Sequence, residues 1–247
     1  FPGYGFLSEN QDFVEICKLH NIKFIGPSSE VMEKMADKSK AKEEMVKAGV
    51  PVVPGSKGAV RTLDEGKKIA REIGYPIMAK ASAGGGGRGM RLIKEEKDFD
   101  SQYLAASSEA LAAFGDGTMY LERFINNPRH IEVQVIGDSH GNAIHIGERD
   151  CSLQRRHQKV IEESPAILLN DETRAKLHEV AVKATKYLKY EGAGTFEFLA
   201  DDKQNIYFME MNTRLQVEHP VSEMVSGLDI IEWMIKVAEG EKLAALH

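Results

Sequence analysis

Residues 194–212, GTFEFLADDKQNIYFMEMN, contain the pattern that decides the fold. Two mostly apolar runs, 195–200 and 206–211, flank a polar segment and predict a β-hairpin. If residues 202–205 form a four-residue turn, Glu197 lies directly opposite Glu210, with Cβ atoms about 4.5–5.5 Å apart. A five-residue turn would put the two glutamates on opposite faces.

Two carboxylates at that spacing repel each other unless a cation or a proton lies between them. Asn212, two residues after Glu210, points to the same face and adds a neutral oxygen. This set of ligands suits Mg²⁺ or Mn²⁺ bridging phosphates better than zinc. We therefore predict a metal site on Glu197, Glu210 and Asn212; the alternative is a solvated hairpin face.

The hairpin is followed by the run RLQVEHP, residues 214–220. Arg214 and Gln216 offer forked donors to a small planar anion, and Glu218 is a candidate general base beside it. We expect an extended run, because Pro220 disfavours a helical conformation at His219. Arg214 would then keep Glu218 ionised by lowering its carboxyl pKa. Taken alone, the run fits a salt-bridged loop better.

Four consecutive glycines, residues 84–87, lie between two predicted strands, with Lys80 at the end of the first. Glycine N–H groups can approach phosphate oxygens closely, and a lysine adds a point charge. A flexible tip without a ligand is the alternative, because glycine motifs have many false positives. Neither a P-loop nor a Rossmann fingerprint is present.

A third polar cluster spans residues 148–159, ERDCSLQRRHQK, which offers many groups for polyphosphate contacts. A solvated loop is the simpler interpretation. For Cys151 we favour a buried small hydrophobe over a modifiable thiol.

The remaining pattern predicts the other elements of an α+β protein. Residues 50–56 contain two prolines and form the first plausible domain boundary. The segment after it predicts a small unit with the order β-α-β-β-α-β. The predicted elements are helices at 8–19 (opened by a Ser8–Gln11 capping pair), 28–36, 38–48, 62–73, 99–114, 171–188 and 229–239, and strands at 22–25, 76–81, 90–93, 119–123 and 130–135 with a hairpin partner after residue 141.

Composition favours an ordinary globular protein. The net charge of −6 argues against a general binder of nucleic acid or membrane surfaces, and no apolar run approaches the ~18 residues of a membrane span. Two distant cysteines, Cys17 and Cys151, indicate a reducing compartment, so we expect the cytoplasm or an organelle matrix. Both ends look cut, so we expect a piece of a longer protein.

Together these runs resemble the biotin carboxylase family of the ATP-grasp superfamily. The likeness covers essentially the whole chain, and the combination of runs is far more specific than any single motif. The matching runs are residues 2–10, 80–90, 127–130, 148–159, 192–198 and 210–220.

The resemblance implies an ATP-grasp fold, in which a small α+β lid at about 53–124 covers a larger antiparallel-sheet subdomain. Residues 1–36 would be the remnant of an N-terminal α/β domain, and residues 37–247 the ATP-grasp domain. Much of that N-terminal domain and a C-terminal domain would be missing. Phe1 stands where the family usually has histidine, and Ala83 replaces a loop glycine.

The resemblance also implies residue roles. Metal ions would be held by Glu197, Glu210 and Asn212, and Glu218 would deprotonate bicarbonate. Bicarbonate would be bound by Lys159, Arg214, Gln216 and the Val217 backbone. Lys159 and Arg214 would be catalytic residues as well. ATP would be contacted by Lys38, Lys80, the loop Gly84, Gly85, Gly86 and Gly87, Glu122, Phe124, Ile125, His130, Gln154, His157 and Leu199.

The implied reaction uses Mg-ATP or Mn-ATP, with two ions, and bicarbonate to make carboxyphosphate, which carboxylates biotin on a carrier protein. A carboxyltransferase would be a further partner, the parent would be a homo-oligomer, and neither nucleic acid nor membrane would be bound. Among possible acceptors we favour acetyl-CoA. The piece itself is expected to bind ATP and turn over poorly. The competing hypotheses are another ATP-grasp ligase and a nucleotide-binding module without catalysis.

Overall fold

The computed structural model describes residues 1–81, 89–156 and 158–243, apart from the side chains of residues 38 and 39. The chain divides into two compact units. The sheet unit comprises Phe1–Val52 and Asn127–His247, and the small unit comprises Val53–Asn126. Together they make the mixed α and antiparallel β architecture that the sequence predicts.

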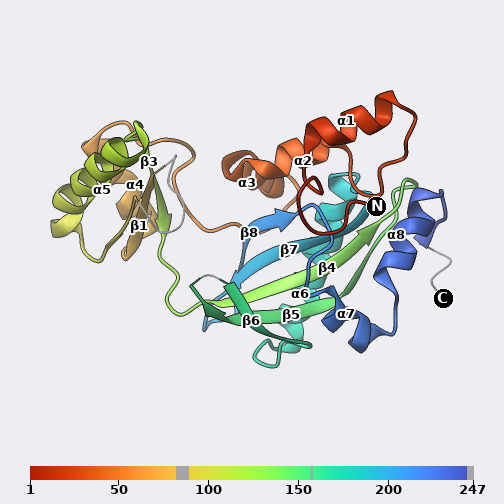
Figure 1. Cartoon of the computed structure of the whole chain (residues 1–247). Coiled ribbons are helices and arrows are strands. Elements are labelled where there is room, and N and C mark those ends of the chain that lie inside the picture. Colours follow the sequence, from red (N-terminus) through yellow and green to blue (C-terminus); the bar gives the residue numbers. More distant parts are fainter. Residues whose placement is uncertain (82–88, 157, 244–247) are drawn as a thin grey trace. The chain divides into compact units, whose positions relative to one another are not determined.

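The sheet unit is built on five antiparallel strands in the order β6-β5-β4-β7-β8 (Figure 1). One face packs on α2, α3 and α6 through a large apolar cluster, and the other carries a second cluster against α8. The elements are α1 Gln11–Leu19, α2 Ser29–Ala36, α3 Lys38–Lys47, β4 Arg129–Gly137, β5 Ala143–Arg155, β6 Gln158–Glu163, α6 Asp171–Tyr187, β7 Gly192–Ala200, β8 Ile206–Asn212, α7 His219–Ser226 and α8 Ile230–Ala238.

The small unit has three antiparallel strands in the order β2-β1-β3, packed on α4 and α5. The expected first strand is reduced to two isolated bridges, Gly55 with Glu122 and Val60 with Met119. The elements are α4 Leu63–Ile73, β1 Ile77–Ala81, β2 Met90–Ile93, a short 3-10 helix Glu96–Asp98, α5 Phe99–Phe114 and β3 Met119–Arg123.

The hairpin β7–β8 has the predicted pairing of its two glutamates, but its turn differs from the predicted one. Glu197 pairs with Glu210, as predicted, but Ala200 pairs with Ile206, so the turn has five residues and the expected four-residue turn is wrong. The Asp201 carboxylate holds this longer turn by accepting backbone N–H bonds from Lys203 and Asn205 at 3.0 and 2.8 Å. A bulge between residues 208 and 210 then restores the register.

Three local predictions are corrected. Residues 22–25 lie in irregular structure, because Phe24 packs edge-on against Phe13 and Ile25 against the α8 cluster instead of pairing with a strand. The first helix is capped by Asn10, whose side chain accepts from the Phe13 N–H at 2.7 Å, and not by Ser8. His219 begins α7 and is not extended, because Pro220 lies in the first turn, where its missing N–H is not needed.

A buried carboxylate ties α6 to the sheet. Glu148 of β5 is 2% exposed and accepts from Arg174 Nε at 2.9 Å and the Ala166 N–H at 3.1 Å, and its second oxygen lies 2.6 Å from His178 Nε2. Burial alone would raise the pKa of Glu148, but these partners outweigh it and lower the pKa to about 2. The charged form is therefore the one that stabilises the fold.

We predict that Glu148→Gln costs about 3 kcal/mol of unfolding free energy at pH 7. A depressed carboxyl pKa stabilises the fold above the ordinary value of 4.5, and this stabilisation is lost as the pH falls through about 2. Urea unfolding of both proteins should show the gap shrinking between pH 4.5 and 2. A gap that stays constant over this range would contradict the assignment.

Candidate functional site

Alternation along β4 sorts its side chains between two environments. Ile131, Val133 and Val135 enter the large apolar cluster, so the intervening polar side chains face the other side of the sheet. There Glu132 lies directly opposite Glu197 of β7, and both are nearly inaccessible to solvent. Two buried carboxylates side by side need compensating positive charge.

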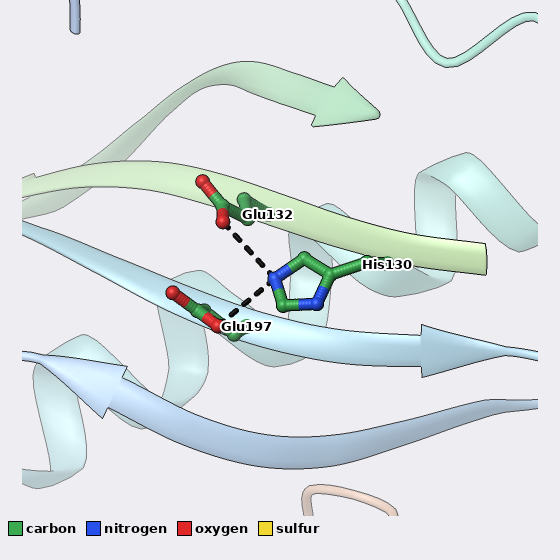
Figure 2. A group of neighbouring side chains, drawn as sticks. All are labelled: His130, Glu132 and Glu197. Atoms are coloured by element: carbon green, nitrogen blue, oxygen red, sulfur yellow. Dashed lines mark hydrogen bonds and ion pairs between the residues drawn. The ribbon is translucent and has the colours of Figure 1, made fainter. Parts of the chain in front are cut away.

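His130 supplies part of that charge. Its Nε2 lies 3.0 Å from Glu132 and 2.9 Å from Glu197, between the two carboxylates (Figure 2). Burial alone would lower the pKa of His130, but the bonds to Glu132 and Glu197 outweigh it and raise the pKa to about 9. The imidazole is therefore protonated at neutral pH and bridges the pair as a cation.

Lys159, from β6, is the second bridging cation. Its ammonium pairs with Glu132, lies 3.1 Å from Glu197 and 2.8 Å from Glu218, and so joins three carboxylates. Burial opposes the charges, yet the Lys159 pKa is raised by Glu132 and Glu197, and the Glu218 pKa is lowered chiefly by Lys159. Lys159 thus keeps Glu218 ionised, and the prediction that Arg214 does so is wrong.

Arg214 lies elsewhere because residues 213–218 bend instead of continuing as a strand. Its Nη2 donates to Asn212 Oδ1 at 3.0 Å, and its Nε to Glu9 at 3.0 Å. Asn212 Nδ2 in turn donates to Glu197 at 2.7 Å. Glu9 also accepts from the Thr213 N–H and hydroxyl, so a residue 205 positions away in sequence holds Arg214 in place. Sequence reasoning gave Glu9 no role.

Arg149 is the other site residue that sequence reasoning missed, although it lies inside the polar run 148–159. It pairs with Glu132 across β4–β5 and is fully buried. Its place opposite Glu132 depends on the pairing of β4 with β5, which the local sequence around Arg149 does not reveal. Its bonds include Glu132 at 3.2 Å and Gln216 at 2.7 Å, and Gln216 Nε2 reaches Glu197 at 3.2 Å.

The metal ligands expected from sequence are only partly brought together. Among the residues described, the ligand atoms of His130, Glu132 and Glu197 lie within 4.8 Å of one another, and Glu132 forms a second such group with Cys151 and Glu218. Glu210 belongs to neither group, although its backbone pairs with Glu197. Cys151 is buried as expected, and burial raises its thiol pKa.

The predicted ATP contacts fall on both units. In the small unit, Lys80 Nζ donates to Glu122 at 2.5 Å, and the Phe124 N–H donates to the Pro76 carbonyl at 3.0 Å; Ile125 is half-buried. In the sheet unit, Leu199 pairs with His130, and Gln154 Nε2 donates to the Cys151 carbonyl at 2.9 Å. Gly84, Gly85, Gly86, Gly87, His157 and the Lys38 side chain lie outside the described part of the chain.

The family model described as "Carbamoyl-phosphate synthase L chain, ATP binding domain" matches residues 37–246. The chain belongs to this family. A second model, the N-terminal domain of biotin carboxylase, matches residues 1–32. The expected ATP-grasp fold and likeness to biotin carboxylase are thereby confirmed.

Relatives and solved structures of this ATP-binding family agree. A biotin carboxylase from Nostoc sp. is 57% identical over 98% of the chain and 54% of its own length, and a 2-oxoglutarate carboxylase small subunit from Hydrogenobacter thermophilus is 54% identical over 98% and 51%. A Campylobacter jejuni biotin carboxylase structure matches with a TM-score of 0.85 and 70% identity, over 98% of the chain and 54% of its own. The chain spans about half the length of these curated relatives.

We predict that Lys159→Met destabilises this ATP-binding chain by about 3 kcal/mol, because it leaves three carboxylates without their shared cation. Urea unfolding at pH 7 measures the loss. Lys236→Met is the matched control, since Lys236 pairs with a single exposed carboxylate, Glu232, at 2.7 Å and should change stability by less than about 1 kcal/mol. Equal effects of the two substitutions would show that the Lys159 cluster contributes no special stability.

Proposed function

We propose that the chain is the ATP-binding core of a biotin carboxylase, which uses Mg-ATP and bicarbonate to carboxylate biotin on a carrier protein. The observation that carries the proposal is the half-buried Lys159–Glu218 pair at 2.8 Å beside the buried Gln216. It combines an anion-binding cation, an amide donor and an ionised carboxylate, which a bicarbonate-activating site needs. The ligase activity of the high-identity relatives supports the same reading.

The anion site is supported by the way donors converge. Lys159 Nζ and Gln216 Nε2 both reach the same Glu197 oxygen, at 3.1 and 3.2 Å. A carboxylate and bicarbonate present similar planar oxygens, so the two donors are already arranged for such a group. We assign bicarbonate to Lys159, Gln216, Arg214 and the Val217 backbone. A related 2-oxoglutarate carboxylase domain has been solved with MgADP, ADP and bicarbonate.

Glu218 is proposed as the base. Its lowered pKa leaves it ionised at neutral pH, ready to accept the bicarbonate proton. The deprotonated oxygen then attacks the γ-phosphorus of ATP, so that a P–O bond to ADP breaks and carboxyphosphate forms. Carboxyphosphate then splits into phosphate and carbon dioxide; the carbon dioxide bonds to the ureido nitrogen of biotin, and the released phosphate accepts the proton of that nitrogen.

The donor set fits divalent metal ions. Glu197, Glu210 and Asn212 supply the hard oxygen ligands that Mg²⁺ or Mn²⁺ prefers, and Glu197 and Glu210 pair across the hairpin. When bound, two such ions would neutralise charge on the phosphates. Asn212 would have to turn, because its Oδ1 accepts from Arg214 and its amide nitrogen faces Glu197.

ATP is assigned to residues of both units, with the small unit acting as a lid. Lys80 and Glu122 form a ready ion pair there, and His130 lies on the sheet between acidic partners. The proposed contacts are Lys38, Lys80, Gly84, Gly85, Gly86, Gly87, Glu122, Phe124, Ile125, His130, Gln154, His157 and Leu199.

Partners follow from the relatives by analogy. These relatives include a 2-oxoglutarate carboxylase small subunit and a methylcrotonoyl-CoA carboxylase subunit alpha. We propose a biotin carrier, a carboxyltransferase and a homo-oligomeric parent in the cytoplasm, with acetyl-CoA as acceptor. Within the described residues, no helix is both long and apolar enough to cross a bilayer.

The test of the proposal compares this chain with its full-length parent. Calorimetric titration with ATP, with and without Mg²⁺, should show metal-dependent binding to the chain. Phosphate release that depends on both bicarbonate and biotin should appear in the parent and be weak in the chain alone. Failure of the folded chain to bind ATP would refute the proposed site, and a chain as active as the parent would refute its dependence on further domains.

We predict that Glu218→Gln in the parent lowers kcat for biotin-dependent phosphate release by ~10²–10⁴-fold, because the amide cannot accept the proton. ATP affinity should survive, since Glu218 is not among the proposed metal ligands. Steady-state assays and ATP titration measure the two effects separately. A fully active variant would remove Glu218 from the mechanism.

We predict that Glu210→Gln weakens Mg²⁺-dependent ATP binding, because it removes a ligand charge while keeping the shape of the side chain. ATP titrations over a range of Mg²⁺ concentrations measure the change. Glu239→Gln, at the C-terminal end of α8, is a control outside the site. Identical Mg²⁺ dependence in wild type and Glu210→Gln would exclude Glu210 as a ligand.

A further inference from the structure

Arg149 is a fully buried arginine in the middle of the sheet unit. Removing a guanidinium from water costs several kcal/mol unless its donors are satisfied and its charge is balanced. Three buried or half-buried carboxylates, Glu132, Glu197 and Glu218, face Arg149, Lys159 and His130 in the same cluster. Charge balance therefore explains why a cation is present, but not why it is an arginine.

The hydrogen bonds show what the fork of an arginine adds. Nη1 donates to Gln134 at 2.9 Å and to the Ser222 hydroxyl at 2.7 Å. Nη2 donates to Gln216 at 2.7 Å, to Glu132 at 3.2 Å and to the Thr195 hydroxyl at 3.5 Å, while Nε has no partner among the described residues. The two terminal nitrogens thus hold five partners from β4, β7, α7 and the segment before α7. A lysine ammonium could not span them, because it is a single point donor.

Arg149 fixes which way the Gln216 amide faces. A guanidinium can only donate, so Gln216 must present its oxygen to Arg149. Its NH₂ group then turns toward Glu197, where it donates at 3.2 Å. Without Arg149 the amide could flip and offer an oxygen, which would repel an anion at the same place.

Arg149 also reaches the proposed base through α7. Ser222, one of its partners, lies one turn after Glu218, the residue at the N-cap position of this helix. Ser222 is almost completely buried, so the bond to Arg149 is shielded from water. One side chain therefore anchors both the amide donor and the helix that carries the base.

We propose that Arg149 is a positioning residue for bicarbonate: it orients the Gln216 amide as a donor and holds α7 so that Glu218 faces the anion. The inference rests on the proposed function. A purely structural role predicts that its loss lowers stability and leaves the response to bicarbonate unchanged.

The test uses the full-length protein and the pair Arg149→Lys and Arg174→Lys. Arg174 of α6 is the matched control, because its guanidinium also holds several partners, among them Glu148 and the Ala166 carbonyl. These contacts lie where α6 packs on the sheet. Arg149→Lys should raise the KM for bicarbonate by about tenfold or more, the value of one or two lost charge-assisted bonds. The KM for ATP should stay within about twofold, and Arg174→Lys should change neither constant.

An unchanged bicarbonate KM in a folded Arg149→Lys protein would overturn the inference. Equal increases for bicarbonate and ATP, or the same increase in Arg174→Lys, would do so as well. If the wild type shows no bicarbonate-dependent phosphate release, the proposed function itself fails and the inference falls with it.

Ser222→Ala keeps the test decisive if Arg149→Lys does not fold. It removes one acceptor on α7 and leaves the guanidinium paired with Gln216 and Glu132. The expected result is a kcat for phosphate release lowered by about threefold or more, with the KM for ATP within about twofold. An unchanged kcat in this variant would remove the link between Arg149 and the base.

Discussion

The sheet unit is organised around Glu132 and Glu197, two carboxylates placed side by side on adjacent strands and sealed from water. Such a pair is unfavourable alone, so cations must surround it. His130, Lys159 and Arg149 come from three strands, and each contacts at least one of the two carboxylates. The polar side of the sheet is thus a balanced ionic cluster, and the apolar clusters hold the strands that position it.

This balance affects how the site could bind anything. Every described cation of the cluster already has carboxylate partners, so a bound anion must share these cations with the protein's own acids. Glu218 shows the effect most clearly, because its partner Lys159 is also the proposed anion ligand. Binding and release of a small anion would then exchange one ion pair for another. No cation would have to remain without an anionic partner in this poorly solvated site.

Much of the fold follows from sequence because the helices and strands have regular periods. The helix at 99–114 and the strand at 119–123 coincide with α5 and β3, and the strand predicted at 130–135 lies within β4. Strand β6 was missed because its sequence, QKVIEE, is mostly polar and lies within a charged run. Helix α7 was missed because a proline suits both an extended chain and the first turn of a helix. Arg149 and Glu9 depend on contacts between distant segments, which local spacing does not encode.

The hairpin turn has a consequence for how such sites are recognised. The Asp201-stabilised turn contains one residue more than the simplest register requires, and the bulge in β8 absorbs that residue before Glu210 is reached. The longer turn and the bulge therefore cancel, and Glu197 still faces Glu210. The number of residues between the two glutamates is the same as for a four-residue turn without a bulge, so their spacing in the sequence does not reveal which turn joins the strands. A search pattern with a fixed interval between these two acids would find hairpins of both kinds and could not distinguish them.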